Sequence, residues 1–194
     1  MLFSLFEIFN IFVMSFALGF IFTGIAKRPK TNLENYYRSL TKKSFRINTF
    51  IKDLLYSTAV IAPGIVLHEM GHKFTAILFG AHATFYASYE FLGLGIILKL
   101  VNFPFLFFIP GYVSIIGSLT ALQSALIAFD GPFMNLIVSM VSLLLFKKLN
   151  KINQKWKKAL YLSYKINLFL FFFNLIPIPP FDGYTVLTGL IRAF

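Results

Sequence analysis

The chain has 194 residues, of which 58% are hydrophobic, and its mean hydropathy is +0.77. This composition excludes a water-soluble domain and predicts one multi-pass membrane domain over residues 1–194. The net charge of +11 would suit a nucleic-acid partner, but the basic residues cluster at the ends of apolar runs, and no nucleic-acid-binding module is present. We therefore expect no nucleic acid and expect the basic segments to lie against the head groups of a lipid bilayer.

Four apolar runs are each long enough to cross about 30 Å of hydrocarbon as a helix. They cover Leu2–Ala26, Leu54–Gly80, Thr120–Phe146 and Ala159–Pro180. The first run has no basic stretch before it and no small-residue cleavage signal before Lys27, so we expect a retained anchor helix rather than a signal peptide.

In the connection that follows the first run, the apolar residues of segment 33–40 share one helical face. This segment is predicted to be either a short interfacial helix or a solvated linker.

The second run contains the sequence His-Glu-Met-Gly-His, with His68, Glu69 and His72. Positions four apart lie on one face of a helix, so both imidazoles can bind one metal while Glu69 stands beside them. The chain has no cysteine, so a metal must take nitrogen and oxygen donors, and zinc accepts neutral imidazoles. Two structural histidines are the alternative. A functional site is favoured because an unpaired glutamate in hydrocarbon costs about 2.5 kcal/mol or more.

The segment from Ala83 to Ser118 is interrupted by glycines and prolines and cannot form one long helix. Its aromatic and β-branched residues predict three short strands, Thr84–Tyr89, Ile96–Val101 and Tyr112–Ile116. Because the segment is apolar, we expect a small sheet that dips into the bilayer beside the metal-binding helix, with a surface loop as the alternative. The predicted fold is an all-α membrane bundle of about four transmembrane helices, with this membrane-embedded sheet or hairpin between the second and third.

A catalytic zinc site usually has three protein ligands and a water, so one ligand must come from outside the second run. Asp130 in the third run and Asp182 after the fourth are carboxylates in apolar surroundings. Prolines in segment 177–180 force the chain out of helical geometry just before Asp182, which is a usual way to turn a carboxylate toward a site in a bundle. Depth along the helices excludes neither aspartate.

Three other residues are weaker candidates for the third ligand. Distances of about 22 Å and 15 Å along a helix separate Asp53 and His82 from the histidine pair, so a salt bridge and an interfacial position explain them better. Glu90 could line the cavity or face water.

These motifs together resemble the site-2 protease family of intramembrane zinc metalloproteases. The resemblance covers most of the chain from Leu54 to Gly183. It rests on the histidine motif with Gly71, on Pro110-Gly111-Tyr112-Val113, on Gly131-Pro132-x-x-Asn135, and on Asn174-x-x-Pro177-x-x-x-x-Asp182-Gly183. The chain departs from the commoner family pattern at Phe181 and Tyr184, where leucine and a second glycine are frequent, and at Asp130, where a small residue is frequent.

The resemblance implies that His68, His72 and Asp182 bind Zn²⁺ and that Glu69 is the catalytic base. It also implies that Asn174 helps to hold the substrate or the developing oxyanion, with Asn135 as a second candidate. The implied activity is hydrolysis of peptide bonds within or near transmembrane segments of membrane-protein substrates. An extended substrate could add as a strand to the edge of the small sheet.

Several alternatives to this function stay open at the level of sequence. The chain could be a catalytically inactive homologue that only binds membrane segments, or a different membrane protease with the same histidine motif. Proteases of that second kind typically take their third ligand from a glutamate on a later helix. A transporter or a purely structural bundle would leave the histidine motif without a role. For Asp130 we expect a structural role or a contact with a ligand histidine, with a proton relay or a pair with Lys165 as further options.

Two indications of membrane orientation disagree. The basic connections before the second run and after the third would place those ends in the cytoplasm, whereas members of the resembled family often have the end after the histidine motif facing the cytoplasm. Labelling one residue of the Lys27–Lys52 connection from each side of the membrane distinguishes these orientations.

Overall fold

The computed structural model describes residues 2–30, 47–103, 109–149 and 151–194. Its elements follow one another in the order α1 (Leu5–Ile21), the 3-10 turn η1 (Phe22–Gly24), α3 (Ile47–Leu78), β1 (His82–Ala87), α4 (Tyr89–Leu100), β2 (Gly111–Ile116), α5 (Ala121–Lys148), α6 (Gln154–Asn174) and α7 (Asp182–Ala193). The segment 33–40, predicted as an interfacial helix or a linker, lies outside the described residues.

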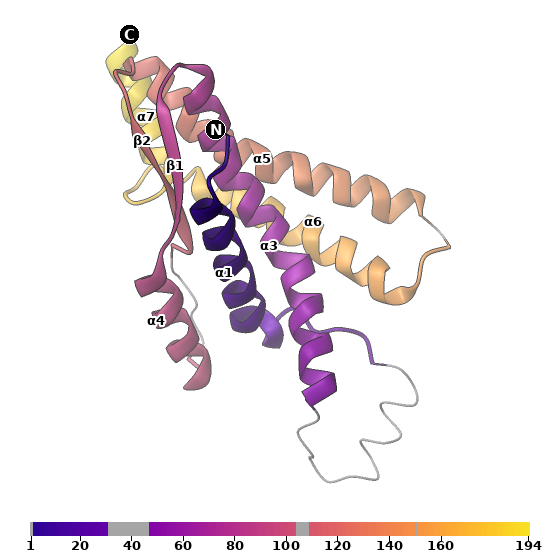
Figure 1. Cartoon of the computed structure of the whole chain (residues 1–194). Helices are drawn as coiled ribbons and strands as arrows, with labels where there is room; N and C mark the ends of the chain where they lie inside the picture. Colours follow the sequence, from indigo (N-terminus) through magenta and orange to yellow (C-terminus); the bar gives the residue numbers. More distant parts are fainter. Residues whose placement is uncertain (1, 31–46, 104–108, 150) are drawn as a thin grey trace, which may run out of the picture.

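Helix α3 is the central element of the bundle. It packs against α1 and the strands on one side and against α5 on the other (Figure 1), and α5 in turn packs against α6 and α7. Glycines allow the closest of these approaches. A β-carbon added at Gly19 of α1 would lie only 3.1 Å from the Thr58 Cα atom of α3.

Three described helical segments are long and apolar enough to cross a membrane. They are Leu5–Gly24, Asn48–Leu78 and Ala121–Lys148, with mean hydropathies of 2.1, 1.5 and 1.6. The first three predicted spans are therefore confirmed by length and composition. The fourth predicted run forms α6, a helix of 21 residues that does not qualify as a span by these criteria. Lysines near its start and middle lower its hydropathy.

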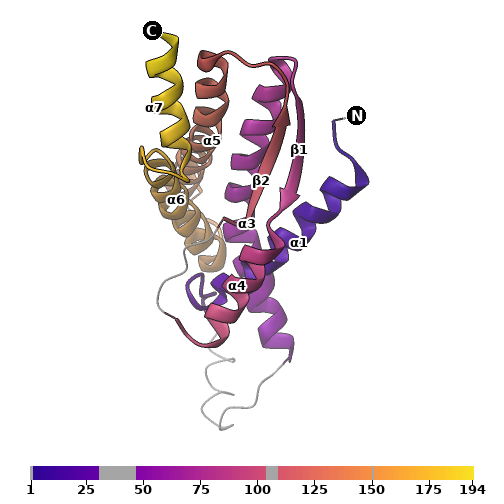
Figure 2. The ribbon, with the colours of Figure 1, turned by 90° about the vertical axis from the view of Figure 1, so that its left-hand side faces the viewer.

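A small antiparallel sheet is present between the second and third spans, as predicted. Strands β1 and β2 pair with Phe85 opposite Val113 and with Ala87 opposite Gly111. The two strands overlap two of the three predicted ones and run alongside one half of α3 (Figure 2). The buried side chains of Phe85 and of Met14 on α1 belong to the core cluster between these layers.

The strand predicted at Ile96–Val101 is wrong, because residues 96–100 lie in helix α4 and Val101 is its C-cap. The glycines that suggested turns are accommodated inside this helix. A β-carbon at Gly93 would meet no atom within 4 Å, and Gly95 is buried. The Lys99 ammonium donates to the Ile21 carbonyl oxygen of α1 at 3.0 Å, so contacts with α1 stabilise the helix against weak local propensity.

The tight crossing of α1 and α3 leads to a prediction about stability. Gly19→Ala should lower the melting temperature of the purified protein, by the equivalent of about 1–3 kcal/mol, because the new methyl group forces the two helices apart. Thermal unfolding in detergent measures this effect. Gly24→Ala is the matched control, since a β-carbon there meets nothing within 4 Å. Equal melting temperatures for the two variants would contradict the close packing at Gly19.

Candidate metal centre

The second half of α3 presents two histidines to the same point. The rings of His68 and His72 are 4.8 Å apart between centroids and perpendicular to each other. Their Nε2 atoms lie 3.2 Å apart, and both residues are 9% exposed. The spacing of four residues thus places the two rings one turn apart on one face of the helix, as the sequence predicted.

Both imidazoles are oriented through their Nδ1 atoms by groups of α5. His68 Nδ1 lies 2.8 Å from the Asn135 Oδ1 atom, and His72 Nδ1 lies 2.7 Å from the Ile127 carbonyl oxygen. A carbonyl oxygen can only accept, so His72 Nδ1 carries a proton. Asn135 donates its amide nitrogen to the Gly64 carbonyl oxygen and to Asn167, which leaves its Oδ1 as acceptor for His68. In the neutral imidazoles, both Nε2 atoms therefore carry free lone pairs.

The carboxylate of Asp182 completes the group of donors. Asp182 Oδ2 lies 3.2 Å from His68 Nε2 and Asp182 Oδ1 lies 3.4 Å from His72 Nε2. Burial by itself raises the pKa of the Asp182 carboxyl, but the two imidazoles beside it outweigh this effect, and the pKa lies below its ordinary value. The carboxylate is therefore ionised and available as a ligand.

Glycines in the elements around Asp182 bring this residue to the histidines. A β-carbon at Gly183 would collide with the backbone of Leu175 and Ile176 at the end of α6, and one at Gly189 would lie 2.8 Å from the Ala121 carbonyl oxygen of α5. Helix α7 can dock on α5 and α6 at this distance only with glycine at both positions. The proline-broken segment before α7 supplies the change of direction that the sequence predicted.

The three residues fit a zinc ion in number, kind and spacing. Two neutral imidazoles and a carboxylate are donors that zinc prefers, and tetrahedral bonds of about 2.0–2.1 Å require donor atoms about 3.3 Å apart. The observed separations are 3.2 Å between the two Nε2 atoms, and 3.2 Å and 3.4 Å to the carboxylate. In the described part of the chain, no other set of three such side chains is close enough to hold a metal.

Helix α5 closes over the donors through Gly131. A β-carbon at this position would lie 2.9 Å from His68 Nε2 and nearer still to the His72 ring. On the opposite helix, Gly71 faces the Asp130 carbonyl oxygen, 2.7 Å from where a β-carbon would be. The two glycines explain why the histidine motif and the Gly-Pro motif can lie in direct contact.

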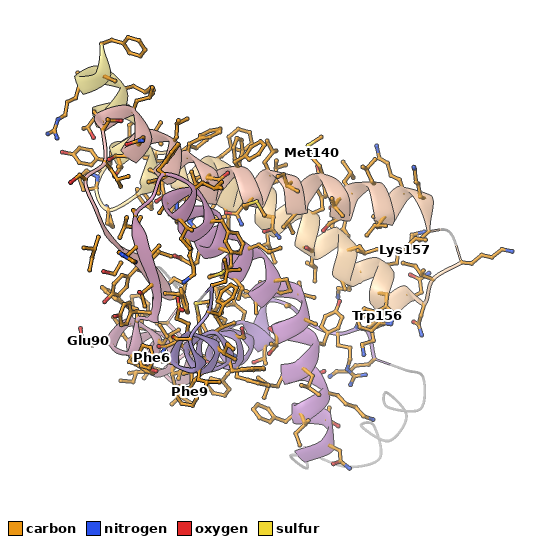
Figure 3. All side chains as sticks on the ribbon, turned by 45° about the horizontal axis from the view of Figure 1, so that its top comes forward. Phe6, Phe9, Glu90, Met140, Trp156 and Lys157 are labelled. Atoms are coloured by element: carbon orange, nitrogen blue, oxygen red, sulfur yellow. The ribbon has the colours of Figure 1, made fainter. Side chains whose placement is uncertain are left out.

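The other acidic candidates lie away from the donors. The Asp130 carboxylate accepts a hydrogen bond from Thr75 Oγ1, and is outside the donor cluster. Asp53 pairs with Arg28 at 3.0 Å. Glu90 is exposed at the start of α4, on the outside of the molecule (Figure 3). Among the carboxylates that the sequence left open, the described structure groups Asp182 with the two histidines.

A cavity of about 1060 Å³ opens beside the donor group. Its polar lining includes Glu69, which is only 7% exposed, and Asn174 at the end of α6. The Asn174 side chain makes no hydrogen bond with the described part of the chain. Most of the remaining lining is apolar and comes from α1, α3, α6 and β2. The cavity can therefore hold an apolar chain next to the metal donors.

Of the two groups that orient the histidines, sequence reasoning missed one and gave the other a different role. The contact of His72 with the Ile127 carbonyl oxygen could not be predicted from the sequence, because every residue has a backbone carbonyl group. Asn135 was singled out as a substrate-binding candidate; it lines the cavity, but its side chain is buried and is hydrogen-bonded to His68, Gly64 and Asn167. An asparagine in an apolar helix is itself the signal of such a network, because its amide needs several partners.

Comparisons with known proteins agree with this chemistry. The model of peptidase family M50 matches residues 145–194. A protein of Methanocaldococcus jannaschii, provisionally named a zinc metalloprotease, is 38% identical over 145 residues, which are 74% of this chain and 73% of that protein. The protein Rip2 of Mycobacterium tuberculosis, named in the same provisional way, is 29% identical over 150 residues, which are 66% of this chain and 54% of its own length. No solved structure matches the chain.

The extent of the first of these matches decides the family. It covers nearly three quarters of both proteins, and the family model covers the C-terminal segment that contains Asp182. The resemblance seen in the sequence is confirmed. The chain belongs to peptidase family M50, the site-2 protease family, and is a membrane zinc metalloprotease with Zn²⁺ as its cofactor.

Proposed function

We propose that this enzyme cleaves peptide bonds within or near transmembrane segments of other membrane proteins. The observation that carries the proposal is that the Asp182 carboxylate of α7 lies 3.2–3.4 Å from two imidazoles on α3, a helix apolar enough to span a membrane. A substrate must reach such a site from within the bilayer or from its surface. The protein is a multi-pass one in this proposal, with α1, α3 and α5 as spans and α6 as a fourth.

His68, His72 and Asp182 hold the metal, and Glu69 is the general base. A zinc ion held by these residues would supply a Lewis acid for the scissile carbonyl and for the attacking water. Glu69 follows His68 directly and lines the same cavity, so its carboxylate takes a proton from the attacking water and delivers it to the leaving amine. The apolar walls exclude other water and strengthen these interactions.

The two asparagines have different roles in this proposal. Asn174 lines the cavity, its side chain has no hydrogen-bond partner among the described residues, and it binds the substrate or the developing oxyanion. Asn135 holds the His68 ring in place through Nδ1, and is therefore a positioning residue rather than an oxyanion donor. Its contact resembles the outer hydrogen bonds that orient metal-bound histidines in many proteins.

Strand β2 offers the binding edge for an extended substrate. Residues of segment 109–113 and Ile115 line the cavity together with the metal donors. A peptide that pairs with this edge leaves its helix and exposes its carbonyl groups to the metal. Substrates with helix-breaking residues near the cleaved bond are therefore preferred, because unwinding costs less there.

Removal of the third ligand should abolish metal binding. Asp182→Ala is expected to weaken zinc affinity by more than about 100-fold, beyond the effect usual for outer hydrogen-bond partners. Zinc content of the purified protein, determined by elemental analysis, measures the loss. Asp130→Asn is the matched control and should retain zinc, because Asp130 contacts Thr75 and none of the donors. Zinc loss in both variants, or in Asp130→Asn alone, would refute the assignment.

Replacement of the base should separate metal binding from catalysis. Glu69→Gln is expected to keep its zinc and to lose at least about 100-fold in the rate of cleavage, the usual contribution of a general base. The rate is followed with a transmembrane substrate protein in liposomes. Met70→Leu, a buried neighbour on the same helix, should keep both zinc and activity. A fully zinc-loaded Glu69→Gln enzyme with unchanged rate would exclude this role for Glu69.

Zinc affinity distinguishes a positioning role of Asn135 from an oxyanion-binding role. As a positioning residue, Asn135→Leu should reduce zinc affinity by about 10–100-fold, because the His68 ring loses its acceptor. Ser139→Ala, one turn further on α5 and equally buried, serves as control and should bind zinc normally. An Asn135→Leu variant with normal zinc affinity and a reduced rate would instead favour the oxyanion role.

A further inference from the structure

The outer edge of β1 is occupied by side chains of two helices. The Phe85 amide donates to Glu7 Oε1 at 2.8 Å, and the Ala87 amide donates to Asn10 Oδ1 at 3.0 Å. Lys73 of α3 donates to the Ala83 carbonyl oxygen at 2.8 Å. Residues 83, 85 and 87 alternate along the strand, so their backbone groups point to the same edge, away from β2.

Glu7, Asn10 and Lys73, here called the polar clasp, are almost completely buried. Their exposed fractions are 4%, 0% and 2%. Lys73 forms an ion pair with Glu7, and the remaining polar atoms of Glu7 and Asn10 bond with Ser4 and Phe6 inside α1. A charged pair in apolar surroundings is costly unless such partners are complete. Here the charges also satisfy backbone groups that would otherwise be buried without partners.

The same alternation assigns the free edge of the sheet. Gly111, Val113 and Ile115 lie opposite residues 87, 85 and 83, so their backbone groups also point away from the partner strand. These three residues line the cavity beside the metal donors. Their backbone groups on this edge make no hydrogen bond to another described element. One edge of the sheet is thus filled by the polar clasp and the other is open toward the metal centre.

We propose that the polar clasp acts in place of a third strand and positions the hairpin, so that only the β2 edge next to the metal can receive a substrate. One part of this proposal, the addition of a substrate strand at the β2 edge, rests on the proposed function. Lys73 follows His72 directly, so the same turn of α3 bears a metal donor and a clasp residue. Helix α1 is therefore part of the substrate-positioning unit and not only a membrane anchor.

Pulsed electron paramagnetic resonance tests the positioning without any substrate. The chain has no cysteine, so spin labels can be placed at Ile116→Cys on β2 and Leu126→Cys on α5, both at exposed side chains. The clasp-free variant Glu7→Leu/Asn10→Leu/Lys73→Met removes both charges together and leaves no unpaired buried charge. In nanodiscs, its distance distribution should be at least about twofold broader than that of the labelled parent, because the hairpin opens locally.

Two further variants make the test specific. Lys99→Met is the control, because Lys99 also donates to a backbone carbonyl oxygen but joins α4 to α1 and not the hairpin to α1. The distance distribution of this variant should match that of the labelled parent. Asn10→Leu alone removes no charge and should give a smaller broadening, which keeps the test valid if the triple variant fails to fold. Zinc content of the clasp variants should stay within about twofold of the parent, because no metal donor is touched. An unchanged distribution in both clasp variants overturns the proposal.

Photo-crosslinking separates the polar clasp from the proposed substrate edge. The probe is a synthetic peptide of alternating valine and threonine with one benzophenone group, added to the same nanodiscs and mapped by mass spectrometry. It should label residues 111–116 of the parent and not residues 82–87, and labelling of β2 should fall about fivefold in the clasp-free variant as the edge becomes mobile. Equal labelling of both strands in the parent refutes the sealed edge. Absence of label on β2, with the expected resonance result, refutes strand addition in the proposed function and leaves the positioning role of the clasp supported.

Discussion

The hydrogen bonds between the Nδ1 atoms of His68 and His72 and the acceptors on α5 are the interactions on which the metal centre depends. They fix the tautomer of each ring and turn both Nε2 lone pairs to the same point. The contact requires α3 and α5 to lie very close, which is why Gly71 and Gly131 face the opposite helix. This helix pair thus supplies two of the three candidate donors and the groups that orient them.

A second constraint acts on the backbone. In hydrocarbon, each unpaired amide or carbonyl group costs several kcal/mol, so a strand can lie at membrane depth only where protein or water satisfies its edges. Side chains of α1 and α3 bind the backbone on the outer edge of β1, and the other edge of the sheet, on β2, faces the cavity. The buried charges of Glu7 and Lys73, which would be unfavourable alone, are tolerated because they solve this problem.

Local patterns predicted the parts of the fold that depend on neighbouring residues. Three of the four predicted spans, the helical spacing of the histidine pair, two of the strands and the break before Asp182 are present. The strand at Ile96–Val101 was wrong, because contacts with α1 outweigh the turn preference of two glycines in α4. The pairing of Glu7 with Lys73 was not foreseen, although two charged groups in or beside apolar runs indicate that each needs a partner.

The sequence by itself determined the chemistry available to this protein, since no cysteine is present and the histidine motif lies on an apolar helix. It could not decide between Asp130 and Asp182, because both lie at suitable depths along their helices. Only the tertiary structure shows that Asp182 lies next to the two histidines, because glycine contacts dock α7 on α5 and the end of α6, whereas the Asp130 carboxylate accepts a hydrogen bond from the Thr75 hydroxyl. The physical reason is that distance along a helix is set locally, whereas distance between helices is set by the size of the side chains that separate them.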